Sequence, residues 1–117
     1  MPDIHIMGLD QYLFKHETPV ETAYWRKQPW LDKYMYDLWD DRTDNSLNCQ
    51  RLTLSYNDIQ TILDKLKDPN SDIHPDDDFL DENQEWHAKE LKRTITHFEH
   101  ALADTQSGQQ IYYTNWW

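Results

Sequence analysis

Aromatic side chains must supply much of the core of this chain, and that requirement constrains its fold more than any other feature of the sequence. The chain has six Trp, seven Tyr and three Phe among 117 residues, whereas 28% of its residues are charged. Each buried aromatic ring removes roughly 150–250 Å² from water, so a modest number of rings can hold a polar chain together. A chain of this length has room for one core, and we expect residues 1–117 to form a single domain.

Glycine is nearly absent, since Gly8 and Gly108 are the only two. Loops that cradle phosphates need glycine, so the sequence argues against a glycine-rich nucleotide-binding fold and predicts no cofactor. The single cysteine, Cys49, cannot close an intramolecular disulfide, and residues 1–5 lack the pattern of a signal peptide. We expect a buried thiol in a reducing cytoplasm. Without an apolar run of about 20 residues, we expect no membrane-spanning segment.

Apolar periodicity predicts about three strands and three helices. Ser55 followed by Asp58 is typical of a helix N-cap, and Pro29 suits a first helical position. Residues 16–21 contain Pro19 and read as a connection. The expected strands are residues 9–15, 50–54 and 111–117, and the expected helices begin near Pro29, run over 55–67, and run from about 82 to 103 with Trp86 facing inward. This order predicts an α+β fold, a small and mostly antiparallel sheet packed with helices.

Negative charge is concentrated in one segment, which we expect to be an acidic loop over residues 68–85. Eight of the 22 acidic residues lie there, with no Lys or Arg before Lys89, and the formal net charge of the chain is −11. This charge repels nucleic-acid backbones and anionic membranes but attracts basic protein surfaces. The segment therefore favours a basic protein partner and no direct nucleic-acid binding. The alternative is a solvated loop without a partner.

Metal and catalytic sites have weaker support. A calcium loop starting at Asp76 would need glycine at its sixth position, where Asp81 stands. His87, His97 and His100 suggest a zinc site or a small histidine-dependent enzyme, but their spacing lacks the His-x-x-x-His pattern. We therefore predict no metal and no catalysis.

The C-terminus ends in two tryptophans, Trp116 and Trp117, which are costly to expose. We expect them to pack as part of the last strand. Tyr112 and Tyr113 would place aromatic rings on both faces of that strand, which leaves a homodimer interface open as an alternative.

Three segments together resemble a family of small uncharacterised proteins of tailed phages and prophages. They are Met-Gly-Leu-Asp-Gln-Tyr-Leu at 7–13, Tyr-Trp-Arg-Lys at 24–27, and Tyr-Tyr-Thr-Asn-Trp at 112–116. The resemblance makes residues 1–6 an N-terminal extension and implies a phage context, but it implies no activity. The acidic run replaces a glycine- and aromatic-rich loop of such proteins, so it is a speciality of this chain.

These observations lead to a hypothesis of stoichiometric protein binding, not catalysis. Carboxylates spaced along a surface can occupy Lys and Arg sites that otherwise hold a nucleic-acid backbone. The hypothesis is a DNA-mimic-like inhibitor of a host protein that handles nucleic acid, such as a CRISPR or restriction effector. The expected binding residues form a main set and a second edge: Asp72, Asp76, Asp77, Asp78, Asp81, Glu82 and Glu85, then Asp37, Asp40, Asp41 and Asp44.

Overall fold

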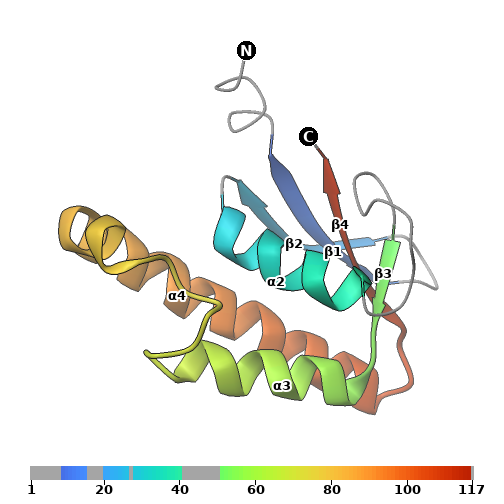
Figure 1. The fold of residues 1–117 in the computed structure, drawn as a ribbon. Coiled ribbons are helices and arrows are strands. Elements are labelled where there is room, and N and C mark those ends of the chain that lie inside the picture. The colour runs from blue at the N-terminus through green and yellow to red at the C-terminus, as the bar shows by residue number, and fades with distance from the viewer. Residues whose placement is uncertain (1–8, 16–19, 27, 41–50, 117) are drawn as a thin grey trace.

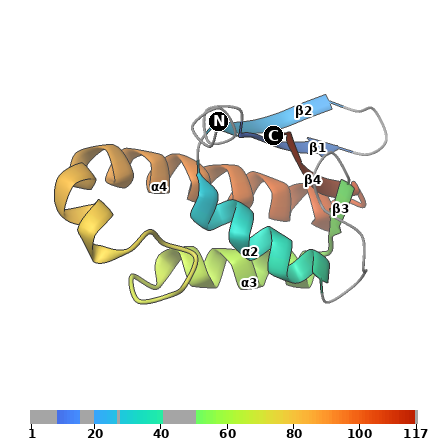
Figure 2. The ribbon, with the colours of Figure 1, turned by 45° about the horizontal axis from the view of Figure 1, so that its top comes forward.

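The fold is α+β, as the sequence predicts, and is seen in a computed structural model that describes residues 9–15, 20–26, 28–40 and 51–116. Within these ranges one four-stranded antiparallel sheet carries three helices, all on the same face (Figure 1; Figure 2). The strands are β1 (Asp10–Lys15), β2 (Val20–Arg26), β3 (Arg51–Leu54) and β4 (Ile111–Trp116), in the order β2-β1-β4-β3. The helices are α2 (Pro29–Asp40), α3 (Tyr56–Lys67) and α4 (Asp77–Gln106).

Strand β2 was not among the sequence predictions, which treated residues 16–21 as a connection. It pairs antiparallel with β1, opposite Leu13 at Ala23 and opposite Gln11 at Trp25, with a register shift between Leu13 and Phe14. Among residues 21–26 of this strand, where burial is described, only Ala23 and Trp25 are buried, so the apolar pattern there is short. Backbone pairing with β1 stabilises this segment as a strand, and the sequence alone does not reveal that pairing.

The helix-facing side of the sheet forms the core with the helices. Trp25 is fully buried and stacks on Phe98 of α4 at 5.5 Å, and its indole Nε1 donates a hydrogen bond to Thr94 at 2.9 Å. Leu13, Tyr113 and Leu52 lie next to one another across β1, β4 and β3 in this layer. Trp25, Phe98 and Tyr113 anchor this layer, but most of the described core residues are aliphatic, so the expectation that aromatic rings supply much of the core holds only in part.

Adjacent tyrosines of β4 face opposite sides of the sheet, and both are buried. Tyr113 lies beneath the helices, whereas Tyr112 stacks on Phe14 at 5.4 Å with the Arg51 guanidinium 4.9 Å from its ring. The prediction of aromatic residues on both faces is confirmed for this pair. The side chain of Trp116, and all of Trp117, lie outside the described residues, so the packing predicted for them is untested.

Helix α3 follows the sequence prediction closely. Ser55 accepts a hydrogen bond from the Asp58 amide at 3.1 Å, and the Asp58 carboxylate accepts one from the Ser55 amide at 2.9 Å. This reciprocal capping fixes the first turn, because both amides lack partners inside the helix. The apolar face of the helix is fully buried and consists of Ile59, Ile62, Leu63 and Leu66.

Helix α4 begins earlier than predicted, so the expected acidic loop is wrong over residues 77–85. Asp76 caps the helix by accepting a hydrogen bond from the Phe79 amide at 2.9 Å, and Asp77 and Asp78 occupy its first turn. Carboxylates are favourable at this end because the helix dipole is positive there. What reads as a charged loop in the sequence is therefore a charged helix start.

A kink divides α4 at Asn83, whose backbone angles of φ −132° and ψ 30° are not helical. After the kink, Phe98 is buried and Leu91, Ile95 and Leu102 pack against the core. Trp86 was expected to face inward but is 41% exposed. Trp86 lies five residues before Leu91, about 140° away around the helix, so it stands off the apolar stripe of Leu91, Ile95 and Phe98.

Candidate functional site

The main acidic surface is the capped start of α4, residues 76–85, here called the acidic arm. The arm projects beyond the sheet at one end of the molecule (Figure 1; Figure 2). Its carboxylate side chains belong to exposed residues, namely Asp76, Asp77, Asp78, Asp81, Glu82 and Glu85. On a helix, residues three or four apart are neighbours, so these carboxylates form a spaced array.

Two of the predicted binding residues have structural partners. Asp72, in the turn before the arm, forms an ion pair with Lys65 at 3.1 Å, and Asp76 is occupied as the helix cap. The remaining arm carboxylates form no ion pair with any described residue. Their charge is therefore directed to solvent.

The arm is attached to the body of the protein through aromatic rings. Trp30, at the start of α2, lies 5.0 Å from Phe79 and 6.1 Å from Trp86, and Phe79 lies 5.9 Å from Trp86. Asn83 Nδ2 donates to the Phe79 carbonyl at 3.0 Å across the kink. The arm thus rests on α2 through Phe79 and Trp86 while its carboxylates remain exposed.

The kink also opens a shallow hollow next to the exposed indole. It is lined by consecutive residues of the arm and its end, Asp81, Glu82, Asn83, Gln84, Glu85 and Trp86. A cation bound there would meet carboxylates beside the exposed Trp86, and both carboxylates and the face of an indole ring attract cations. This combination suits a Lys or Arg side chain.

The second predicted acidic edge is separate from the arm. Asp37 and Asp40 are exposed on the C-terminal half of α2, whereas Trp30 at the other end of that helix contacts the arm. Twelve helical residues span about 18 Å. Asp41 and Asp44 lie outside the described residues. The described structure therefore does not join the two acidic sets into one surface.

The three histidines considered for a metal site occupy different surroundings. His87 lines a pocket with His74, His97 stacks edge-on against Trp25 at 5.7 Å, and His100 is exposed. Within the described ranges, no three His, Cys, Asp or Glu residues are grouped as a metal site would require. The suggested zinc cluster is not assembled by the residues that the structure describes.

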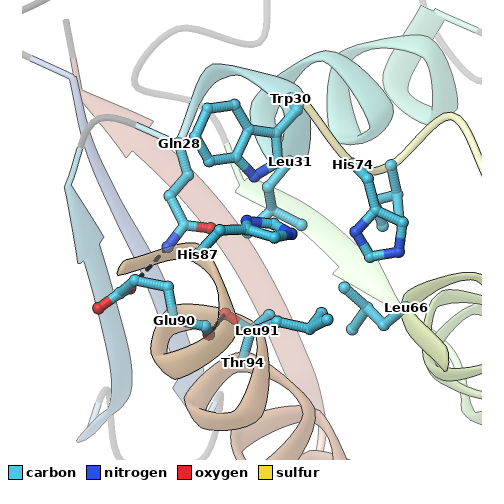
Figure 3. Close-up of a pocket in the computed structure, with 10 residues that line it drawn as sticks. Gln28, Trp30, Leu31, Leu66, His74, His87, Glu90, Leu91 and Thr94 are labelled. Atoms are coloured by element: carbon cyan, nitrogen blue, oxygen red, sulfur yellow. Dashed lines mark hydrogen bonds between the residues drawn. The ribbon is translucent and has the colours of Figure 1, made fainter. Parts of the chain in front are cut away.

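The His74–His87 pocket lies between α2, α3 and α4 (Figure 3). Its volume is about 10 Å³, enough for about one water molecule. The two rings are 5.6 Å apart and nearly perpendicular, and both His74 Nε2 and His87 Nδ1 are buried without a hydrogen-bond partner. Burial, and then the proximity of His74, lower the pKa of His87 below its usual value.

One wall of the pocket is firmly hydrogen-bonded. The Glu90 carboxylate accepts a hydrogen bond from the Gln28 side chain at 2.7 Å and one from Arg93 at 2.9 Å (Figure 3 for the Gln28 bond). Arg93 also donates to the Tyr24 carbonyl at 2.7 Å. Glu90 is thus held between α2 and β2, and its charge is already matched.

A second buried polar cluster centres on Asp32 in the first turn of α2. Its Oδ1 accepts hydrogen bonds from the Tyr113 hydroxyl at 2.6 Å and the Asn115 amide at 2.7 Å. Gln11 Nε2 donates to the Tyr113 oxygen and to the Gln28 carbonyl, both at 3.1 Å, and Gln11 Oε1 accepts from the Gln28 amide. Burial raises the pKa of Asp32, and the hydrogen bonds from Tyr113 and Asn115 oppose that rise.

Sequence reasoning missed Asp32 and His74 as members of buried polar clusters. Asp32 follows Pro29 as an ordinary acidic residue of a first helical turn, and its burial depends on β4, some 80 residues later in the chain. His74 lies in the acidic segment, where nothing local distinguishes it. No local pattern could have found either residue, because each partner is distant in sequence.

Comparisons with known proteins return no match to any family model, any curated protein or any solved structure. The segments that carry the phage-protein resemblance nevertheless have a common location. They contribute β1, β2 and β4, three neighbouring strands of the sheet. None of the helices in the described residues is long and apolar enough to cross a membrane.

Proposed function

We propose that this protein binds a basic surface of another protein in a stoichiometric complex, and that the acidic arm is its contact surface. The observation that carries this proposal is the set of exposed arm carboxylates that have no cationic partner among the described residues. An unmatched array of this kind raises the local concentration of a basic partner and guides its approach. The array is helical, so its spacing is fixed before binding.

The exposed Trp86 gives the arm a second means of binding. Tryptophan is enriched among residues that dominate binding energies, particularly where surrounding polar groups exclude water. Trp86 lies beside Glu82 and Glu85 in the same hollow and is 41% exposed. A partner that places an Arg or Lys side chain there would gain both charge pairing and ring contact.

The partner class we propose is a protein that handles nucleic acid, because such proteins carry basic surfaces for phosphate backbones. Regularly spaced carboxylates can occupy those Lys and Arg sites. The resemblance to tailed-phage proteins supports a setting in the bacterial cytoplasm and a host defence protein, such as a CRISPR or restriction effector, as the target. In this proposal the protein is an inhibitor and not an enzyme.

The test compares two neutralised variants that each remove three negative charges, at different locations. The arm variant carries Asp78→Asn, Asp81→Asn and Glu82→Gln, and the control variant carries Glu21→Gln, Asp64→Asn and Glu99→Gln at exposed sites outside both predicted acidic sets. Binding to a partner isolated from bacterial lysate, and then purified, is measured by calorimetry at low and high salt. We expect the arm variant to lose at least about tenfold in affinity at low salt, which equals 1.4 kcal/mol.

The control variant should retain most of its affinity, since it leaves the arm unchanged. Equal affinity of the arm variant and the unmodified protein at low salt would reject the arm as the contact surface. A similar loss of affinity in both variants would show that binding depends on the overall charge of the protein and not on the arm. Circular dichroism of both variants establishes that α4 is still formed.

One observation favours a histidine-dependent enzyme as the second candidate. His74, His87 and Glu90 line one pocket, and titratable groups that converge in a pocket are what acid–base catalysis requires. The volume of about 10 Å³ suits a water molecule and not a substrate. A dimerising domain is the third candidate, and sedimentation at two ionic strengths tests it, because apolar self-association would persist at high salt.

A further inference from the structure

We infer that the contact between His74 and His87 is a pH-responsive joint that holds the acidic arm in place while the His87 imidazole is neutral and releases it when that ring takes up a proton. The joint is a property of the free protein. Its effect on partner binding rests on the proposed function of the arm, but its existence does not.

The first argument is the location of the pair. His74 belongs to the turn that leads into the arm, and His87 follows the kink at the other end of the arm (Figure 3). The two rings meet at 5.6 Å, and His87 also lies 6.2 Å from Trp30, the residue on which the arm rests. The imidazole contact therefore closes the base of the arm against α2.

The second argument is that the pair is incompletely satisfied. His74 Nε2 and His87 Nδ1 are buried and have no hydrogen-bond partner, in a pocket with room for about one water molecule. A buried polar group without a partner is costly, and a buried charge is costlier. A proton on the His87 ring would therefore favour an arrangement that opens the pocket to water.

The surrounding charges do not offset this cost in the described structure. The only other titratable side chain that lines the pocket is Glu90, which is already hydrogen-bonded to Gln28 and Arg93. The pocket residues of α2 and α3 are uncharged, and the nearby Lys65 and Lys67 pair with Asp72 and Glu99. Asp76, beside the turn, is engaged as the cap of α4.

The direction of the pH effect follows from the lowered pKa of His87. Because the folded state disfavours the charged form, the unfolded or opened state binds more protons. The stabilisation from neutral His87 is complete above its unfolded pKa of about 6.5 and is lost as the pH falls from there toward the folded pKa. The arm is therefore held at neutral pH and released under mildly acidic conditions.

Asn83 provides a place for the movement. Its non-helical backbone separates residues 76–82 of the arm from the part of α4 that packs on the core. Beyond it, Arg93 and Thr94 are hydrogen-bonded to β2, so that part of α4 should remain fixed. Local opening is expected where few core contacts oppose it.

The test is hydrogen exchange of the whole free protein at pH 7.5 and pH 5.5, corrected for the intrinsic effect of pH on exchange. We expect amides of residues 76–85 to exchange up to about tenfold faster at pH 5.5, because that pH lies about one unit below the pKa of an exposed imidazole. Amides of α3 should change much less. The double variant His74→Leu, His87→Leu should lose this response, whereas His100→Gln, at an exposed histidine of the same helix, should retain it.

Three results would overturn the inference: no acid response in the unmodified protein, a response spread evenly over the chain, or an undiminished response in the double variant. Should the double variant fail to fold, the single variants His74→Gln and His87→Gln replace it. No partner is present in these measurements. A negative result in the exchange experiment therefore does not contradict the arm as a binding surface. A negative result in the binding experiment does not contradict the joint.

Discussion

Two polar clusters are buried beneath the first turn of α2, and they differ in how completely their hydrogen bonds are satisfied. In the Asp32 cluster, the Asp32 carboxylate, the Tyr113 hydroxyl and the Gln11 amide all have partners. In the His74–His87 pocket, one nitrogen of each ring has none. The first cluster joins α2 to the sheet, and the second joins α2 to the base of the acidic arm.

This difference shows how one small fold can combine a rigid part, the sheet with its packed helices, with a part that can move, the acidic arm. A satisfied buried network resists rearrangement, because any movement leaves several polar groups without partners at once. A network in which some polar groups already lack partners loses fewer hydrogen bonds when it rearranges. The body of the protein therefore needs the Asp32 cluster for stability, whereas the arm depends on a contact that protonation can change.

The largest expected effect comes from removing the centre of the satisfied cluster. Asp32→Ala leaves the Tyr113 hydroxyl without its acceptor in the core and removes one acceptor from the Asn115 amide. Unpartnered buried groups cost about 1–3 kcal/mol each, so we expect a loss of about 3 kcal/mol in the free energy of unfolding. Urea denaturation at pH 7.5 measures it.

Asp37→Ala is the matched control, since Asp37 is exposed on the same helix. Its effect should stay within about 0.5 kcal/mol. If Asp32→Ala were no more destabilising than this control, the hydrogen bonds of Asp32 would not be what holds α2 on the sheet.

A smaller and more local effect is expected from the two helix caps. Ser55→Ala removes a reciprocal cap from α3, whose apolar face is buried, and should lower the free energy of unfolding by about 1 kcal/mol. Asp76→Ala removes the cap of the arm, and we expect it to speed hydrogen exchange in residues 77–82 with little change in global stability. Equal global losses in the two variants would show that the arm unfolds together with the body.

The smallest effect is expected at the unsatisfied pair at neutral pH. His87→Leu replaces a ring that has an unpartnered nitrogen with an apolar side chain, and such a change can be nearly neutral or stabilising. We expect a change within about 1 kcal/mol at pH 7.5 by urea denaturation. A loss comparable to that of Asp32→Ala would mean that His87 is a fixed part of the core, and the contrast between the clusters would fail.

The fold could be predicted from the sequence where the signal is local. The reciprocal cap of Ser55 and the spacing of Ile59, Ile62 and Leu66 define α3 within a few residues of chain, and the prediction is confirmed. Strand β2 could not be predicted in this way, because among its residues 21–26 only Ala23 and Trp25 contribute buried side chains and its hydrogen bonds are completed by β1. Strand β2 is therefore recognised only in the folded structure, where its backbone pairs with that of β1.

The candidate site was predicted in composition but not in form. The arm carboxylates stand out as an acidic run, yet their helical state depends on the cap at Asp76 and on the contact of Phe79 with Trp30. The kink at Asn83 left no local signal, and Trp86, five residues before Leu91, stands off the apolar stripe on which the sequence prediction placed it. The binding role of the arm remains a proposal.

The sequence by itself determined the α+β class, the capped helix α3 and the concentration of negative charge before Lys89, because each follows from composition or from neighbours a few residues apart. Only the tertiary structure decided that Asp32 meets Tyr113 and that His74 meets His87. The sequence alone does not set the protonation state or the role of a carboxylate or an imidazole. Its charge and its role depend on the groups that surround it after folding, and folding brings those groups from distant parts of the chain.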